Sequence, residues 1–271
     1  MAFHRKEDPF LKQLFLNFKG GTGKTTLSAA YGLLQAERGR RVLFVDLDPQ
    51  GHLTKCVGVN EWQFDKTLYH VLLHGTPVQD IMKKIHGLDA YVVPADFSLS
   101  AAELAISAQP HREWLLVHAL SPLRKEFDLV VLDSSPTISL LNLNAILACN
   151  DLIVPMLPDS LSQHGLKSVI RTLTAIEEDF GHRIGNIGIL LNRFLKNDAH
   201  CRKVRKSLQE TYTSRILKTV IHDDPDFGRQ PILYRFGSRL TTEGQAREDF
   251  AALAREIGPR RAQKPNRRKR K

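Results

Sequence analysis

The sequence has few cysteines, and their positions exclude two kinds of site. Cys56, Cys149 and Cys201 are the only three in 271 residues, and no two of them form a CxxC pair. Disulfide frameworks and zinc sites depend on clustered or regularly spaced thiols. We therefore expect three reduced thiols, without a disulfide scaffold or a structural zinc ion.

Long uncharged hydrophobic runs are also missing. Residues 1–12 contain no apolar core long enough for a signal peptide, and no later stretch approaches about 18 uncharged apolar residues. The apolar share of 42% and the charged share of 25% are those of an ordinary soluble protein. No linker divides the chain, which is long enough for a sizeable core. We predict a cytoplasmic protein with one large domain.

Acidic residues are absent from the end of the chain. Residues 260–271 include eight Lys or Arg side chains and no Asp or Glu, and these eight leave only +2 of the net charge of +10 for all other residues. A segment this charged and this poor in apolar residues does not build a core. We expect residues 258–271 to form a disordered basic tail, which suits contacts with phosphates. A purely solubilising tail is the alternative.

The stretch KGGTGKTT, residues 19–26, is the strongest motif in the chain. Glycines at 20, 21 and 23 allow positive φ and let backbone N–H groups approach an anion closely. The stretch departs from the phosphate-loop pattern GxxxxGK[ST], because Phe18 occupies the first glycine position and Lys19 is an added lysine. A glycine-rich turn that contains lysine by chance is the competing interpretation.

The surroundings of this stretch favour a phosphate-binding loop. Residues 14–18 form an apolar run that predicts a buried strand, and residues 25–38 have apolar positions at helical spacing. A helix that opens at the loop directs its positive end at the phosphates. Lys24 would then reach the β and γ phosphates, and the Thr25 hydroxyl would bind Mg²⁺. The loop residues expected to bind nucleotide are Gly20, Gly21, Thr22, Gly23, Lys24, Thr25 and Thr26.

Acidic residues close the next two strong strand signals. Residues 41–46 (RVLFVD) run into LDPQG and place Asp46 and Asp48 at a strand end, and residues 127–133 (FDLVVLD) end in Asp133. Ligands of open α/β sheets bind at the carboxyl ends of the strands. Asp133 fits the Walker B arrangement, which holds Mg²⁺ through water. The competing interpretation is that these acids only cap loops or a helix.

Strand and helix signals alternate along the rest of the chain. They predict an α/β fold with a mostly parallel twisted sheet and helices on both faces, in a domain over residues 13–257 that follows an extension over 1–12. Further strands are expected at 90–93, 151–157, 186–192 and 216–221. Helices are expected at 67–73, 78–85, 100–120 with an interruption at Pro110, 138–148, from 160 onward, 200–209 and 240–257.

These motifs together resemble the ParA/MinD family of deviant Walker A P-loop ATPases. KGGTGKTT is similar to the family's loop with its signature lysine, and VDLDPQG and VVLDSSP are similar to its switch and Walker B segments. The resemblance covers nearly all of residues 13–257. It is strongest for ParA-type, Soj-like partition ATPases that have no N-terminal DNA-binding domain.

The resemblance implies roles for individual residues and implies ATP and Mg²⁺ as cofactors. Lys19 would reach across a homodimer to the ATP of the partner and, with Lys24 and Asp48, belong to the catalytic set. Asp48 would orient or activate the attacking water, and Asp46 would support the Mg²⁺ shell beside Thr25 and Asp133. Asn192 would contact adenine, although the residues alone describe it equally well as a turn residue.

The resemblance also implies a cellular role. An ATP-bound dimer would bind DNA without sequence preference, and a stimulating partner, ParB-like or a cargo adaptor, would trigger hydrolysis to move a plasmid, chromosome origin or other cargo over the nucleoid. A basic cluster on a predicted helix is a candidate DNA surface or simply a solvated face. The DNA-binding candidates are Arg202, Lys203, Arg205 and Lys206 in that cluster and Arg267, Arg268, Lys269, Arg270 and Lys271 in the tail.

Three other classes compete with this interpretation. A MinD-like membrane-associated ATPase needs apolar residues in an amphipathic C-terminal segment, and the chain after Ile257 has none, although its basic residues could attach weakly to anionic lipid. An electron-transfer ATPase like nitrogenase reductase needs cysteines placed for a shared iron–sulfur cluster, which this chain lacks. A scaffold without turnover would leave the acids at 46, 48 and 133 idle.

Overall fold

The computed structural model describes residues 10–60, 63–224 and 244–259. Within these ranges, eight strands form one sheet in the order β3-β4-β2-β5-β1-β6-β7-β8. All neighbouring strands are parallel except β3, which runs antiparallel to β4 at the sheet edge. The strand bounds are β1 Leu11–Phe15, β2 Val42–Asp46, β3 Lys83–Lys84, β4 Ala90–Val93, β5 Leu129–Asp133, β6 Asp151–Met156, β7 Asn186–Phe194 and β8 Ile216–His222.

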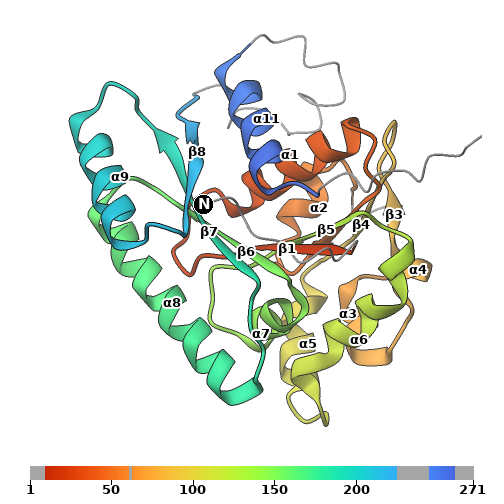
Figure 1. The fold of residues 1–271 in the computed structure, drawn as a ribbon. Coiled ribbons are helices and arrows are strands. Elements are labelled where there is room, and N and C mark those ends of the chain that lie inside the picture. The colour runs from red at the N-terminus through yellow and green to blue at the C-terminus, as the bar shows by residue number, and fades with distance from the viewer. Residues whose placement is uncertain (1–9, 61–62, 225–243, 260–271) are drawn as a thin grey trace, which may run out of the picture.

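Helices cover both faces of this sheet, as the sequence predicts (Figure 1). One face carries α1 Lys24–Glu37, α2 His52–Cys56 and α11 Gln245–Ile257. The other carries α3 Leu68–His74, α4 Val78–Ile81, α5 Ser98–Ile106, α6 Leu115–Leu120, α7 Leu140–Ala148, α8 Ser160–Phe180 and α9 Ala199–Thr211. Two 3₁₀ turns, η2 Arg112–Trp114 and η3 Ser121–Lys125, flank α6.

The apolar strand sequences follow from burial on both faces. In β2, Leu43 and Val45 pack into the core on the α7 and α8 side, whereas Val42 and Phe44 pack into the core under α1. Successive side chains of a strand point to opposite faces, so a strand covered on both sides has a nearly continuous apolar run. This is why the run VLFV predicts a strand correctly.

Several segment boundaries differ from the predicted ones, among them those of the first strand and of the helix expected at 78–85. The first strand occupies Leu11–Phe15 and not residues 14–18, because the buried Gln13 interrupts its apolar run and hides its beginning. Gln13 is satisfied internally, since its Nε2 donates to Ile257 O at 2.9 Å and its Oε1 accepts from Tyr31 OH at 2.6 Å. The helix expected at 78–85 stops at Ile81, and Lys83–Lys84 then pair with β4 as a short edge strand.

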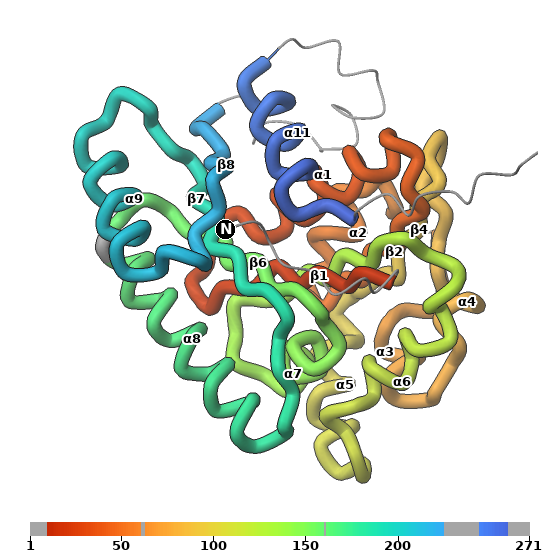
Figure 2. Tube along the Cα trace, in the orientation of Figure 1, coloured from red at the N-terminus to blue at the C-terminus, as the bar shows by residue number. Residues whose placement is uncertain are grey.

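The first and the last helix of the described chain lie side by side. Figure 2 shows α11, drawn in blue, beside α1, drawn in red. Gln35 on α1 donates through Nε2 to Ala254 O on α11 at 3.3 Å. The last helix therefore packs directly on the helix that follows the glycine-rich loop.

The strand order places the glycine-rich loop at the topological switch point of the sheet. β1 lies between β5 and β6, and the chain reaches β5 on one side of β1 before it crosses to β6 on the other. Ligands of such sheets bind where the connections diverge, outside the carboxyl ends of the strands. Among the described residues, every helix is too short or too polar to cross a membrane.

Candidate active site

The glycine-rich loop joins the end of β1 to the start of α1. Gly21 and Gly23 have φ of +74° and +89°, in the left-handed region. At Gly23 a side chain is also sterically excluded, because a Cβ there would lie 2.4 Å from Asn192 Nδ2. No side chain caps the first turn of α1, so its backbone N–H groups face the loop and form a site for an anion.

A cleft of about 760 Å³ opens at this loop. Its walls come from the loop, from the segment after β2, from α5 and from the segment after β5. The lining residues are Gly20, Gly21, Gly23, Lys24, Thr25, Thr26, Asp48, Pro49, Gln50, His52, Cys56, Ser100, Glu103, Ser134, Ser135, Pro136, Thr137, Ser139 and Leu141. The structure thus brings together the loop, Lys24, Thr25 and Asp48, which the sequence predicted as parts of one site.

Lys24 lies at the floor of the loop and is 7% exposed. Burial lowers the pKa of its ammonium, and the nearby carboxylates of Asp133 and Asp48 oppose that shift. The ammonium lies 3.5 Å from Lys19 O, inside the curve of the loop. A buried cation in a loop of N–H donors is suited to an oxygen-rich anion such as a phosphate chain.

Asp133 ends β5 beneath the first turn of α1 and is fully buried. Its Oδ1 accepts from Ser28 Oγ at 3.1 Å, whereas its Oδ2 has no hydrogen-bond partner. Burial raises the pKa of Asp133 to about 8, with a further contribution from Asp46, while the Thr25 and Ser28 hydroxyls and the Lys24 ammonium act in the opposite direction. A buried carboxylate with one free oxygen beside a threonine hydroxyl fits a hard cation such as Mg²⁺.

Ser28 was missed by the sequence prediction. It is fully buried on α1, and besides Asp133 its Oγ also contacts Thr25 O at 3.0 Å. The available signal was its position four residues after Lys24, which places it on the same side of a helix.

Asp46 is a neighbour of Asp133 in the sheet and is also fully buried. Its carboxylate is occupied by protein donors: Thr54 N at 2.8 Å and Thr54 Oγ1 at 2.7 Å on Oδ2, and Asp48 N at 3.1 Å on Oδ1. Burial raises the pKa of Asp46 to about 6 against these hydrogen bonds. Asp46 therefore fixes the segment that carries Asp48, and its expected support of the Mg²⁺ shell stays a prediction.

Asp48 faces the cleft and is well placed to act on a bound ligand. Its Oδ1 accepts from Gln50 N at 2.9 Å, which holds the turn that follows β2. Its side chain is 13% exposed, and His52 Nδ1 lies 3.9 Å from its Oδ2. The carboxylate is thus oriented and accessible, as a group that positions water must be.

Asn192 lies beneath the glycine-rich loop and is 8% exposed. Its Nδ2 donates to Thr22 O at 2.9 Å, so the amide holds the loop from below. It does not line the cleft. In this structure the donor expected to read adenine is engaged by the loop, and a contact with the base stays a prediction.

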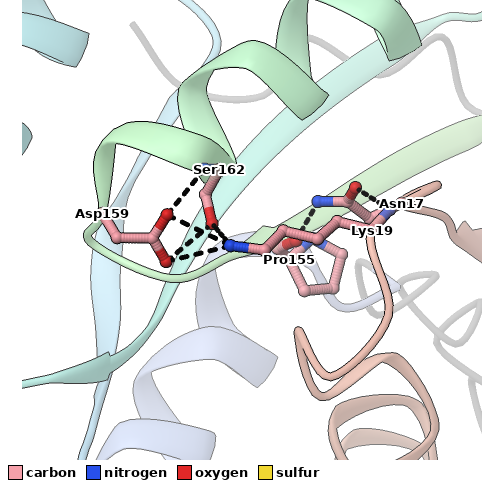
Figure 3. Close-up of polar contacts among 5 residues, drawn as sticks. All are labelled: Asn17, Lys19, Pro155, Asp159 and Ser162. Carbon is pink, nitrogen blue, oxygen red and sulfur yellow. Dashed lines mark hydrogen bonds and ion pairs between the residues drawn. The ribbon is translucent and has the colours of Figure 1, made fainter.

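Lys19 turns away from the cleft lining and contacts the start of α8 (Figure 3). Its Nζ donates to Asp159 Oδ1 at 3.1 Å and to Ser162 Oγ at 3.1 Å. Both partner residues were missed as site residues, because they follow β6, far from Lys19 in the sequence.

The basic cluster on α9 divides into two groups. Arg202, Lys203 and Lys206 are exposed, as a DNA surface would require. Arg205 is turned inward, where its guanidinium lies 5.8 Å from the Phe194 ring and donates to Lys218 O at 2.9 Å. Arg205 is half-buried and engaged by these two contacts, and its contact with DNA stays a prediction. The tail candidates, Arg267 to Lys271, lie outside the described residues.

Comparison with known proteins decides the family. A family model described as an AAA domain matches residues 13–185, well over half of the chain. The chain belongs to this family of P-loop ATPases. Its relatives and structural neighbours are of the ParA/MinD type, which confirms the resemblance seen in the motifs.

Two relatives indicate the kind of process such ATPases serve. The chain is 41% identical over 218 residues to the cell division protein PomZ of Myxococcus xanthus, with 80% of this chain and 68% of that protein covered. It is 30% identical over 251 residues to the chromosome partitioning protein ParA of Caulobacter vibrioides, with 89% and 91% covered. Among solved structures, the ATP complex of an McdA variant from Cyanothece has the same fold, with a TM-score of 0.84, 19% identity and coverage of 95% and 100%. The chain is thus an ATPase of a family of positioning ATPases.

Proposed function

We propose that this chain is a nucleotide switch: with Mg²⁺ and ATP it forms a homodimer that binds DNA without sequence preference and positions a plasmid, chromosome origin or other cargo. The observation that carries the proposal is the cleft in which the glycine-rich loop, Lys24, Thr25 and Asp48 converge above Asp133. The relatives named for chromosome partitioning and cell division support the cellular part of the proposal.

The residues of the cleft have separate tasks in ATP hydrolysis. Mg²⁺, when bound, neutralises charge on the β and γ phosphates. Thr25 and Asp133 hold that ion, Lys24 binds the β and γ phosphate oxygens, and Asp48 orients the water that attacks the γ phosphorus to give ADP and phosphate. Asn192 supports the loop and is proposed to contact adenine once ATP is in place.

Lys19 makes hydrolysis depend on a second subunit in this proposal. Each subunit donates Lys19 to the phosphates of the other subunit's ATP, where its positive charge stabilises the transition state as an arginine finger does. For arginine fingers the effect on rate is about 10³- to 10⁵-fold. Hydrolysis removes the γ phosphate and the dimer opens, so the ATPase acts as a timer whose rate a ParB-like protein or cargo adaptor increases.

DNA is the proposed surface on which the dimer acts, which makes the protein cytoplasmic and nucleoid-associated. The exposed side chains of Arg202, Lys203 and Lys206 on α9 offer three positive charges. The basic tail adds the cationic residues Arg267, Arg268, Lys269, Arg270 and Lys271. Contacts of this type bind phosphates and carry no sequence information.

Co-sedimentation tests the proposal directly. The full chain is mixed with Mg²⁺ and either ATP, ADP or no nucleotide, and is centrifuged with non-specific duplex DNA or with vesicles that contain anionic lipid. We expect sedimentation with DNA only in the presence of ATP. Binding to DNA that ignores the nucleotide contradicts the switch, and ATP-dependent binding only to vesicles favours the MinD-like alternative.

A further inference from the structure

The cis contacts of Lys19 occupy the group that the proposed dimer needs. The ammonium lies 3.1 and 3.2 Å from the two carboxylate oxygens of Asp159 and 3.1 Å from Ser162 Oγ (Figure 3). An ammonium has three N–H donors and accepts nothing. All of these donors are therefore directed at the start of α8, and none is left for a phosphate of a partner subunit.

The acceptor side of this contact is held in place by the helix. Asp159 is the N-cap of α8, where its Oδ1 accepts from Ser162 N at 2.7 Å and its Oδ2 from Ser162 Oγ at 3.0 Å. Ser162 is fully buried, so its hydroxyl has a fixed position between Asp159 and Lys19. Partial burial tends to raise the pKa of Asp159, but these hydrogen bonds and the Lys19 ammonium outweigh it and lower the pKa. The carboxylate is thus charged at neutral pH.

The donor side is held at its backbone. Lys19 N donates to Asn17 Oδ1 at 2.9 Å, and Asn17 Nδ2 donates to Pro155 O on β6 at 2.7 Å. The loop that carries Lys19 is therefore tied to the strand that leads into α8. The side chains of Lys19 and Asp159 remain 29% and 38% exposed, so this contact can open without unfolding the core.

We infer that Asp159 and Ser162 are positioning residues that hold Lys19 in cis until the ATP dimer forms. The inference rests on the proposed function, because Lys19 must be needed in trans for its release to matter. Dimerisation then requires that each subunit exchange its Lys19–Asp159 pair for contacts with the partner's nucleotide. The contact with the start of α8 therefore adds a free-energy cost to dimerisation. This cost acts as a threshold, because a dimer without bound ATP has no phosphate contacts that offset it.

The size of the threshold follows from the exposure of the pair. Partly exposed ion pairs stabilise by a factor of about two to five in an equilibrium constant. A symmetric dimer releases two pairs, and the factors multiply. Loss of the Asp159 charge should therefore tighten the ATP dimer by roughly 4- to 25-fold.

Asp159→Asn is the informative variant, because asparagine is as good an N-cap as aspartate and only the charge is lost. The matched control is Asp198→Asn. Asp198 is the N-cap of α9 and accepts from Cys201 N at 2.7 Å, so it caps a different helix from the one that Lys19 contacts. Dimer dissociation constants are measured by sedimentation velocity of the full chain with Mg²⁺ and a non-hydrolysable ATP analogue. We expect Asp159→Asn to dimerise more tightly than both the wild type and the control.

A second measurement tests the contact in the nucleotide-free chain. Melting temperatures of Lys19→Gln, Asp159→Asn and the double variant form a mutant cycle. We expect the double variant to lose no more stability than Asp159→Asn alone, because either change already breaks the pair.

The outcomes separate the inference from the proposed function. A wild type that stays monomeric with the analogue refutes the proposed function and with it the threshold. If the wild type dimerises but Asp159→Asn dimerises no more tightly than Asp198→Asn, only the inference is overturned. Strictly additive melting temperatures in the cycle overturn it as well.

Discussion

At the scale of single residues, the least ordinary feature is a pair of buried carboxyl groups at the ends of neighbouring strands. Asp46 and Asp133 stand opposite each other in the β2–β5 register, and both are fully buried. Burial disfavours the charged form of both, and the nearby charges of Asp46 on Asp133 and of Asp48 on Asp46 add to that effect. Under the proposed function this cost has a purpose, because a bound Mg²⁺ would need an anionic ligand at that place.

Asp133→Asn should stabilise the nucleotide-free chain at alkaline pH. Burial raises the pKa of Asp133 from an ordinary value of 3.8 to about 8. The folded state therefore holds a proton that the unfolded state has released, and the stabilisation is lost as the pH rises from about 4 through 8. Asparagine resembles the neutral acid and lacks this loss.

Thermal melts between pH 5 and pH 8.5 test this prediction. The melting temperature of Asp133→Asn minus that of the wild type should grow by several degrees or more over this range. Each pH unit between the two pKa values costs the wild type about 1.4 kcal/mol, and about 1 kcal/mol corresponds to roughly 2–4 °C in a chain of this size. The variant should also lose the stabilisation that Mg²⁺ and ATP give the wild type. If the difference in melting temperature does not change with pH, the raised pKa of Asp133 is refuted.

Lys19→Ala and Asp48→Ala should fail in different ways. Without Lys19 the dimer-dependent ATPase rate should fall by about 10³-fold or more, by analogy with arginine fingers. Without Asp48 the attacking water is not oriented, so the ATP-bound dimer should form and persist. ATPase rates at several protein concentrations, together with sedimentation, measure both effects. Turnover equal to that of the wild type in both variants would remove both roles.

At the scale of elements, the site depends on how α1 is joined to β1 and β7. The Gly23 turn brings α1 over the end of β1, and Asn192 at the end of β7 supports that turn through Thr22 O. The polar chain of Gln13, Tyr31 and Gln35 then ties α11 to α1. The glycine-rich loop is thus held by β1, by β7 and by the packed helices α1 and α11.

Gly23→Ala should abolish nucleotide binding, whereas Gly181→Ala should not. Both glycines have left-handed φ, +89° and +65°, so both substitutions strain the backbone by about 1–2 kcal/mol. Only at Gly23 would the new Cβ strike Asn192, because the space around Gly181 is open. Fluorescent nucleotide titration and thermal melts of both variants compare the two effects. Equal loss of affinity in both variants would show that strain, and not the clash, decides binding.

At the scale of the whole molecule, the exposed cationic residues of α9 lie toward one edge of the sheet. The α9 helix packs near β7 and β8, the strands at that edge, whereas β3 forms the other edge. The exposed α9 residues Arg202, Lys203 and Lys206 therefore form a face well separated in the sheet order from β3. A phosphate backbone could contact this face and the basic tail together.

DNA binding by the ATP-bound chain should fall steeply with salt. If about five cationic side chains contact duplex phosphates, log K should change with log salt at a slope of roughly −4.5. Changing Arg202, Lys203 and Lys206 to alanine should make that slope less negative by about 0.9 for each lost contact. Fluorescence anisotropy with a non-specific duplex over a range of salt concentrations measures the slope.

The control removes the same charge elsewhere on the surface. Three exposed lysines toward the β3 side serve this purpose, and the control variant changes Lys66, Lys84 and Lys125 to alanine. It should bind like the wild type. Arg205→Ala should chiefly lower the melting temperature, since Arg205 packs on Phe194. Equal losses of DNA affinity in the α9 and control variants would show that net charge alone governs binding.

Much of the fold and the centre of the site could be predicted from local patterns. Apolar runs such as VLFV and LVVL predicted the central strands, because a strand buried on both faces is built mostly of apolar residues. Residues 19–26 and the acids at or just after the ends of β2 and β5 predicted where the cleft lies. This works because glycine φ values and strand-end carboxylates are local properties. The start of β1 could not be predicted, because the buried Gln13 is accommodated by hydrogen bonds with Ile257 and Tyr31. These residues are distant in the chain, so no local pattern shows the contacts.

The sequence by itself determined that KGGTGKTT, Asp48 and Asp133 belong to one site, since loop geometry and strand ends place these groups, and it led to the prediction that this site binds a phosphate chain. Only the tertiary structure decided what surrounds them. Asn192 supports the loop, Ser28 bonds Asp133, Arg205 turns inward, and Lys19 pairs with Asp159. The physical reason is that each of these contacts joins segments distant in the chain, and hydrogen bonds and ion pairs at about 3 Å form only where folding brings such segments together.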